Sequence, residues 1–232
     1  MICHTDNIDE ALPGREMRRT ALDAAFWLEQ RKRMARRVHG FVASTKMNRP
    51  LHWRSVEEAD LLRLLEVDAR VDAIETCPER IEFVLDGAPR AHVAAIQARS
   101  GRRIVMLDAL RHGERGSPAR ARLTAALTAL YREAGIAYHA VARAAVRAEP
   151  RFSNALHVLA YRGYEPAGGE ELRIIEALTR AGELSLAALE RSVPGATTRA
   201  AACVMAMRSQ LLLKLATAST PDAIGVSLWR LI

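Results

Sequence analysis

The stretch that decides the fold is RAHVAAIQARSGRRIVMLDAL, residues 90–110. Residues 92–98 form a short apolar run, and residues 104–107 form a second run of amino acids that favour strands. Between them, residues 100–103 are typical of a turn, because Gly101 adopts backbone conformations that other residues avoid. The stretch therefore predicts two strands joined by a tight turn.

The sequence on both sides of this hairpin alternates between helix and strand signals. Residues 71–110 are strand-like throughout, with runs at 80–85, 91–98 and 103–109. A leucine-rich helix precedes them. It begins at Ser55, and Ser55 with Glu58 fits a capping box. A second helix, expected over 118–134 and ended by Gly135, precedes another strand from 136. This order predicts an α/β fold.

The two ends of the chain have different patterns from the middle. Residues 15–38 are predicted to be helical, and 40–53 to be an irregular or extended connection. Residues 165–169, EPAGG, are typical of a linker, and residues 169–232 predict three helices and a two-stranded hairpin, the arrangement of a winged helix. The predicted parts are a basic helical segment at 1–39, a central domain at 40–165 and a winged-helix domain at 169–232.

Composition limits the class of protein. Half of the 232 residues are hydrophobic, which suits one large domain or two small ones. No apolar run is long enough to span a membrane, and the first residues lack a signal-peptide pattern. Three widely separated cysteines indicate a reducing compartment, so we expect a cytoplasmic protein. We expect no bound metal and no cofactor, because no zinc-binding, P-loop, dinucleotide or nucleophile-elbow motif is present.

Positive charge is concentrated near the N-terminus. The formal net charge is +7, and the first 54 residues carry eleven Lys and Arg against six Asp and Glu. Such an excess favours contacts with the phosphates of double-stranded DNA, although a solvated helix face is the other interpretation. The candidate DNA contacts from this region are Arg31, Lys32, Arg33, Arg36, Arg37 and Lys46.

The predicted winged helix offers a second set of candidates. In a helix-turn-helix the second helix of the pair places its N-terminal residues in the major groove. Here that helix covers 197–210, and its centre is rich in alanine, so few side chains could read DNA. Binding to a protein partner is the other interpretation of this domain. The candidate contacts are Thr198, Arg199, Arg208 and Lys214.

Residues 40–83 resemble the N-terminal region of TnsA-type transposon endonucleases, and residues 151–164 also resemble the part that follows the nuclease core of that family. The likeness is one of spacing: a glycine start, a serine–x–lysine step, a serine before a helix glutamate, acids after the helix, and a proline before a strand. The matching positions are Gly40, Ser44, Lys46, Ser55, Glu58, Asp60, Leu64, Leu65, Glu66, Asp68, Val71 and Pro78, then Asn154, Leu159, Tyr161 and Arg162. The family has a second, winged-helix domain.

This resemblance implies a restriction-endonuclease-like core, a mixed sheet with flanking helices. Its chemistry needs a helix glutamate, an aspartate on the first hairpin strand, and an acid–x–lysine step on the second, which bind Mg²⁺ and orient water. The glutamate falls on Glu58, although the sequence alone favours a helix-capping role for this residue. The other positions fall on Ala95, Leu107 and Ala109, which have lost these functions. Asp108 is one residue out of step, so we expect its side chain on the other face of the strand.

The sequence therefore predicts a catalytically degenerate nuclease fold without a metal. The leading hypothesis is a non-catalytic DNA-binding protein, either a transcriptional regulator or an accessory DNA-binding factor. One alternative is a protein-interaction subunit of a transposition complex, which binds its partner through the winged helix. The other is a Mg²⁺-dependent endonuclease with relocated ligands. A homodimer is compatible with each hypothesis, and the sequence specifies neither the DNA site nor the partner.

Overall fold

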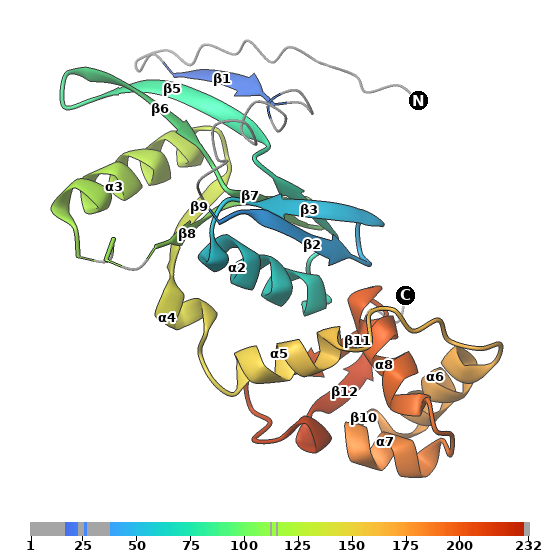
Figure 1. The fold of residues 1–232 in the computed structure, drawn as a ribbon. Coiled ribbons are helices and arrows are strands. Elements are labelled where there is room, and N and C mark those ends of the chain that lie inside the picture. The colour runs from blue at the N-terminus through green and yellow to red at the C-terminus, as the bar shows by residue number, and fades with distance from the viewer. Residues whose placement is uncertain (1–16, 23–25, 27–37, 112, 115, 230–232) are drawn as a thin grey trace. The chain divides into compact units, whose positions relative to one another are not determined.

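The computed structural model describes residues 17–22, 26, 38–111, 113–114 and 116–229, and these form a mixed α/β protein with several β-sheets (Figure 1). The α/β class is thus confirmed. Within these residues no helix combines the length and apolar character that crossing a membrane requires. The chain divides into two compact units. The first comprises Met1–Phe41, Leu51–Ala59 and Ile74–Arg143, and the second comprises Val42–Pro50, Asp60–Ala73 and Ala144–Ile232. The boundaries expected at 39, 165 and 169 stay predictions.

Two sheets and one long helix make up most of the first unit. One sheet is antiparallel, with strand order β1-β5-β6, and the other has strand order β4-β7-β8-β9. In the second sheet β7 and β8 are antiparallel, while β8 and β9 are parallel and are connected through helix α3. The elements are β1 (Arg18–Ala21), β4 (Ala73–Thr76), β5 (Glu79–Leu85), β6 (Ala88–Val93), β7 (Ile96–Ser100), β8 (Arg103–Leu110), α3 (Pro118–Glu133) and β9 (Ala137–Ala142).

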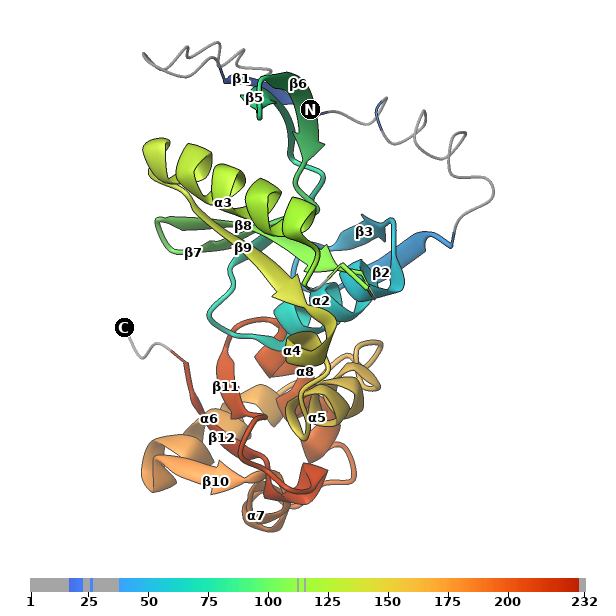
Figure 2. The same ribbon diagram turned by 90° about the vertical axis from the view of Figure 1, so that its left-hand side faces the viewer.

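Helix α3 begins and ends where the sequence predicts. The Ser117 side chain accepts a hydrogen bond from the Arg120 N–H, and Gly135 takes the left-handed conformation, with φ of +70°, just beyond the end. Figure 2 shows α3 lying along β8 and β9. Its buried residues Leu127, Leu130 and Tyr131 pack into a core with residues of both sheets, which are Ile81 and Phe83 of β5, Met106 of β8 and Tyr138 of β9.

The hairpin of residues 90–110 is partly as predicted. Ser100 pairs with Arg103 across a two-residue turn, and Gly101 has φ of +58°, which confirms the turn. The single strand predicted over 92–98 is wrong. Strand β6 ends at Val93 and β7 begins at Ile96, because the chain passes there from one sheet to the other. The intervening alanines carry no apolar–polar alternation that could have indicated this break.

The N-terminal part differs from its prediction in two places. Arg18–Ala21 form strand β1, paired with β5, so the helix predicted over 15–38 does not include them; most of that segment lies outside the described residues. The connection predicted over 40–53 is a two-stranded sheet of β2 (Gly40–Ser44) and β3 (Arg49–Trp53). Asn48, at φ of +49°, allows the turn between its strands.

Most of the second unit consists of short helices and a small sheet with strand order β10-β12-β11. The three helices and two strands predicted after residue 169 are confirmed, and β10 is an additional strand. The predicted helix over 151–164 ends earlier, at Leu159. The elements are α4 (Arg143–Val146), α5 (Arg151–Leu159), α6 (Glu170–Ala181), β10 (Glu183–Ser185), α7 (Leu186–Ser192), α8 (Thr198–Met207), β11 (Leu211–Lys214), the 3-10 helix η1 (Pro221–Ala223) and β12 (Gly225–Leu228).

Helix α8 is the centre of this unit. Every side chain from Ala200 to Met207 is buried, and contacts come from α5, α6, α7 and β11. The apolar core around it includes Val158 of α5, Ile174 of α6 and Leu211 of β11. The stretch from Ala200 to Met207 is apolar and contains no charged residue, which suits a helix buried on all sides.

Helix α2 (Val56–Val67) begins at Ser55 as predicted. The Glu58 N–H donates to Ser55 Oγ over 3.2 Å, which confirms the cap. The return bond of a capping box differs, since the Glu58 carboxylate accepts from the N–H of Arg54, over 2.7 Å, and not from that of Ser55. Glu58 is therefore held at the first turn of α2 with its carboxylate turned back toward Arg54.

Candidate functional site

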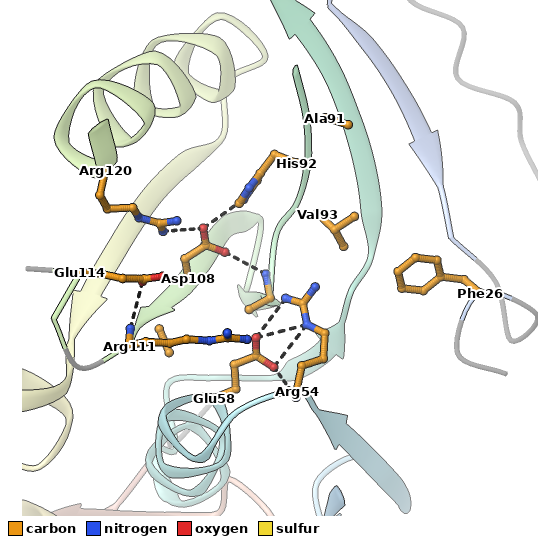
Figure 3. A pocket seen from close by; sticks show the side chains of 12 residues that line it. Phe26, Arg54, Glu58, Ala91, His92, Val93, Asp108, Arg111, Glu114 and Arg120 are labelled. Carbon is orange, nitrogen blue, oxygen red and sulfur yellow. Dashed lines mark hydrogen bonds and ion pairs between the residues drawn. The ribbon is translucent and has the colours of Figure 1, made fainter. Parts of the chain in front are cut away.

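A pocket of about 400 Å³ lies within the first unit (Figure 3). Its lining comes from the start of α2, the end of β6, the end of β8, the residues that follow β8 and the first turn of α3. Charged groups of both signs face it, with three arginines and three acids. The lining residues are Phe26, Arg54, Glu58, Ala91, His92, Val93, Ala95, Asp108, Ala109, Arg111, Glu114 and Arg120.

Glu58 is bound by a single arginine. Arg54 donates to Oε1 from Nη2 over 3.0 Å and from Nε over 3.2 Å. Its backbone N–H holds Oε2. Both carboxylate oxygens of Glu58 are thus hydrogen-bonded to the residue four positions earlier, and the pair is largely buried. Such charge-assisted contacts neutralise the acid and fix its rotamer.

Asp108 is surrounded by donors. Its Oδ1 accepts from the N–H of Ala95 over 3.0 Å. Its Oδ2 accepts from Arg120 Nη2 over 2.9 Å and from the Tyr138 hydroxyl over 2.7 Å, and lies 3.0 Å from His92 Nε2. Burial alone would raise the pKa of this carboxyl. The hydrogen bonds and charge of His92, with the bonds from Tyr138 and Ala95, hold the pKa well below its usual range instead.

The expected alternation between Leu107 and Asp108 along β8 is not contradicted. Asp108 lines the pocket together with Glu58, whereas Leu107 does not (Figure 3). Strand alternation was the basis of that expectation, and it does not determine which face of β8 the pocket occupies. The hydrogen bond from the Ala95 N–H holds the Asp108 carboxylate on the pocket side of β8. Ala95 lies in the segment where the chain passes from one sheet to the other.

Two of the three positions that the resemblance assigns to lost ligands lie at this pocket. Ala95 and Ala109 line it, whereas Leu107 is not among the lining residues and is buried. The structure thus brings Glu58, Ala95 and Ala109 together around one pocket. Sequence reasoning missed Arg54 and Arg120, which hold the acids. Arg54 could have been found from its spacing, since it precedes Glu58 by four residues, but Arg120 meets Asp108 only through the tertiary fold.

The groups at this pocket do not fit the Mg²⁺ ion of the resembled nucleases. Magnesium requires six oxygen ligands in near-octahedral geometry, at least one or two of them carboxylate oxygens. The oxygens of Glu58 and Asp108 already accept bonds from guanidinium, hydroxyl and backbone donors. Among the residues that the structure describes, no cluster of three or more His, Cys, Asp or Glu side chains is arranged to hold a metal.

One buried thiol lies near the charged pair of α2. Burial raises the pKa of Cys77 to about 12, and the nearby Arg54 lowers it only partly. Cys77 and Cys203 are free and buried. A thiol with such a pKa stays protonated at neutral pH, so Cys77 is not poised as a nucleophile.

Ser44 and Lys46, the serine–x–lysine step of the resemblance, lie in the second unit and form hydrogen bonds there. Glu66 near the end of α2 is fully buried and accepts from Ser44 Oγ over 2.7 Å and from two N–H groups of the turn after β2. Lys46 Nζ donates to the Asp68 carbonyl over 3.0 Å and to Ser209 Oγ over 2.9 Å. Burial lowers the pKa of Lys46, and the charges of Glu66 and Asp68 oppose this. We call Ser44, Lys46, Glu66 and Ser209 the turn clamp.

The predicted DNA contacts of the C-terminal region all have partners within the protein. Thr198 is buried and donates to the Val193 carbonyl. Arg199 pairs with both Glu190 and Asp222, each over 2.6 Å. Arg208 pairs with Glu165 and Glu171, and Lys214 pairs with Glu183. Lys46 belongs to the turn clamp. The candidates at 31–37 lie outside the described residues.

No family model matches the chain, and no curated protein matches it either. The function therefore has to be argued from the geometry of the pocket and from the charges around it.

Proposed function

We propose that this chain is a non-catalytic DNA-binding protein built on a degenerate TnsA-like nuclease fold, and that it acts as a transcriptional regulator or an accessory DNA-binding factor. The observation that carries the proposal is the pocket in which Glu58 and Asp108 are each neutralised by an arginine. In the resembled nucleases the position of Glu58 supplies a carboxylate to a metal, and Asp108 directly follows the position of a second acid, which is Leu107 here. Here the guanidinium groups of Arg54 and Arg120 lie beside the carboxylates, where a metal ion would otherwise bind.

The order of elements supports a restriction-endonuclease-like core. Helix α2 comes first, the antiparallel pair β7–β8 follows, and α3 leads into β9, which lies parallel to β8. This gives a mixed sheet with flanking helices and puts the pocket at the start of α2 and the end of β8. The formal net charge of +7 supports binding to a polyanion.

The experiment measures duplex binding by fluorescence anisotropy in Mg²⁺ and in EDTA, and nicking of a supercoiled plasmid. We expect equal affinity in both buffers, because the pocket charges need no metal, and no nicking. Affinity should fall with salt, with a log–log slope of about −0.9 for each phosphate contacted.

Two results would overturn the proposal. One is the absence of duplex binding at low salt. The other is Mg²⁺-dependent nicking that Glu58→Ala abolishes and Glu75→Ala, an exposed acid on β4, does not. The second result would make the protein an endonuclease with relocated ligands.

A second candidate is a protein-interaction subunit of a transposition complex. The strand order β10-β12-β11 after three helices supports a winged helix for residues 169–232. The burial of α8, which in a groove-reading winged helix would face DNA, favours a protein partner for this part. Duplex binding by the isolated chain separates the two candidates, since a pure interaction subunit would show none.

A further inference from the structure

The turn between β7 and β8 carries exposed arginines that no carboxylate neutralises. Arg99, Arg102 and Arg103 lie within five residues, and all three are exposed. None of them forms an ion pair with any residue that the structure describes. Elsewhere many arginines have carboxylate partners, for example Arg54, Arg120 and Arg199. We call Arg99, Arg102 and Arg103 the arginine tip.

The local sequence explains why the arginine tip has no partners. Residues 87–107 contain no Asp or Glu, yet they contain four arginines. Strand neighbours across the hairpin are Ile104 opposite Arg99 and Ser100 opposite Arg103, so no cross-strand acid is available. The positive charge is therefore directed to solvent rather than used inside the fold.

The backbone presents this charge on a fixed support. Strands β7 and β8 pair from Ile96↔Leu107 to Ser100↔Arg103 without interruption, and the turn has only two residues. Ile96 and Ala98 on β7 are buried and anchor the ribbon, and β8 is also paired with β9. Figure 2 shows β7 and β8 side by side, with β9 next to β8. Little backbone entropy is left to lose when the tip binds a partner.

We propose that the arginine tip binds the phosphodiester backbone of duplex DNA. A guanidinium presents donors in a planar fork that matches phosphate oxygens, which makes arginine suited to this contact. Pairing of β8 with β9 begins at Val105, so the end of the hairpin that carries Arg102 and Arg103 extends beyond that pairing and is open to a phosphate backbone. The assignment rests on the proposed DNA-binding function and specifies which residues supply its phosphate contacts.

The test compares wild type with Arg102→Ala/Arg103→Ala on two duplexes of unrelated sequence. We expect about tenfold weaker binding on both duplexes, and a salt slope that is smaller by about 1.8, because two phosphate contacts are lost. Arg102→Lys/Arg103→Lys keeps the charge and should retain most of the affinity. Arg102 and Arg103 are both exposed, so the melting temperature of each double variant should equal that of wild type.

The matched control is Arg173→Ala/Arg191→Ala, which removes the same charge from exposed positions of the second unit. Equal affinity losses in the control and in the tip variant would overturn the assignment, and so would a loss confined to one duplex. In either case wild-type binding would leave the proposed function standing. If wild type binds neither duplex at low salt, both proposals are wrong.

Discussion

The arginine tip and helix α8 show opposite ways of using an arginine-bearing element. At the tip, three arginines are exposed and lack carboxylate partners. At α8, the arginines at both ends are paired with acids, and the helix between them is buried. An arginine that is already paired with a carboxylate attracts a phosphate only weakly, because the ion pair must first be broken. Arginines on the helix expected to read DNA are therefore not by themselves available to bind DNA.

The largest expected effect tests the burial of α8. Ala202→Arg places a charge in a site that has no exposed surface and belongs to an apolar core. Since an uncompensated buried charge is strongly unfavourable, we expect a loss of at least about 3 kcal/mol in the free energy of unfolding. Urea denaturation followed by circular dichroism measures this. Ala181→Arg, at the exposed end of α6, is the control. A stable variant that binds duplex more tightly would mean that α8 faces DNA.

The next effect concerns Asp108, at the other end of β8 from the arginine tip. Asp108→Asn removes the charge that holds Arg120 and should lower the free energy of unfolding by about 3 kcal/mol at pH 7. Asp86→Asn breaks an exposed pair with Arg122 and should change it by less than about 0.5 kcal/mol.

The same variant predicts a pH dependence. The folded-state pKa of Asp108 lies below its unfolded value of about 3.9. Its contribution to stability is therefore complete above that pH and is lost as the pH falls toward the folded pKa. The stability difference between wild type and Asp108→Asn should narrow below about pH 4. A difference that stays constant from pH 7 to pH 2.5 would contradict the assigned contacts.

A smaller effect separates stability from DNA binding. Arg199→Ala removes two ion pairs whose acids are partly or largely exposed, so we expect about 1 kcal/mol of destabilisation. Duplex affinity should equal that of wild type, because Arg199 is engaged within its own unit. Thermal unfolding and anisotropy measure the two quantities on one preparation. A marked loss of affinity at unchanged stability would restore Arg199 as a DNA contact.

The smallest effect concerns the turn that carries the arginine tip. Gly101→Ala forces a side chain into φ of +58°, although a Cβ there would meet no atom within 4 Å. Backbone strain alone should cost about 0.5 kcal/mol. Gly163→Ala has equal space and no left-handed φ, so it should be neutral or slightly stabilising. Equal changes in melting temperature for Gly101→Ala and Gly163→Ala would show that the turn relaxes. The arginines of the tip would then be held less rigidly than inferred.

The sequence predicted the elements better than it predicted their connections. Ser55 marked the start of α2 correctly, because a cap is a local hydrogen bond. The break at Ala94 and Ala95 was missed, since two alanines have the same burial signal in either sheet. Strand β10 was missed as well, because three residues are too short for a periodic pattern.

The site was predictable only in part. Spacing identified Glu58, Ala95 and Ala109, which do line one pocket. It could not show that Arg120, Tyr138 and His92 converge on Asp108, because these residues come from different elements and meet through tertiary packing. It also read Lys46 as a DNA contact, whereas in the turn clamp its ammonium donates to a carbonyl and a hydroxyl.

The division of the chain into interleaved segments has a consequence for synthesis. A ribosome releases the chain from its N-terminus, and a unit can fold once the last of its segments has emerged. All of the first unit is complete at Arg143, but by then only two short segments of the second have been made. The first unit can therefore fold on the nascent chain. The turn clamp is complete only after Ser209 has been synthesised. Until then the segments Val42–Pro50 and Asp60–Ala73 lack the rest of their unit.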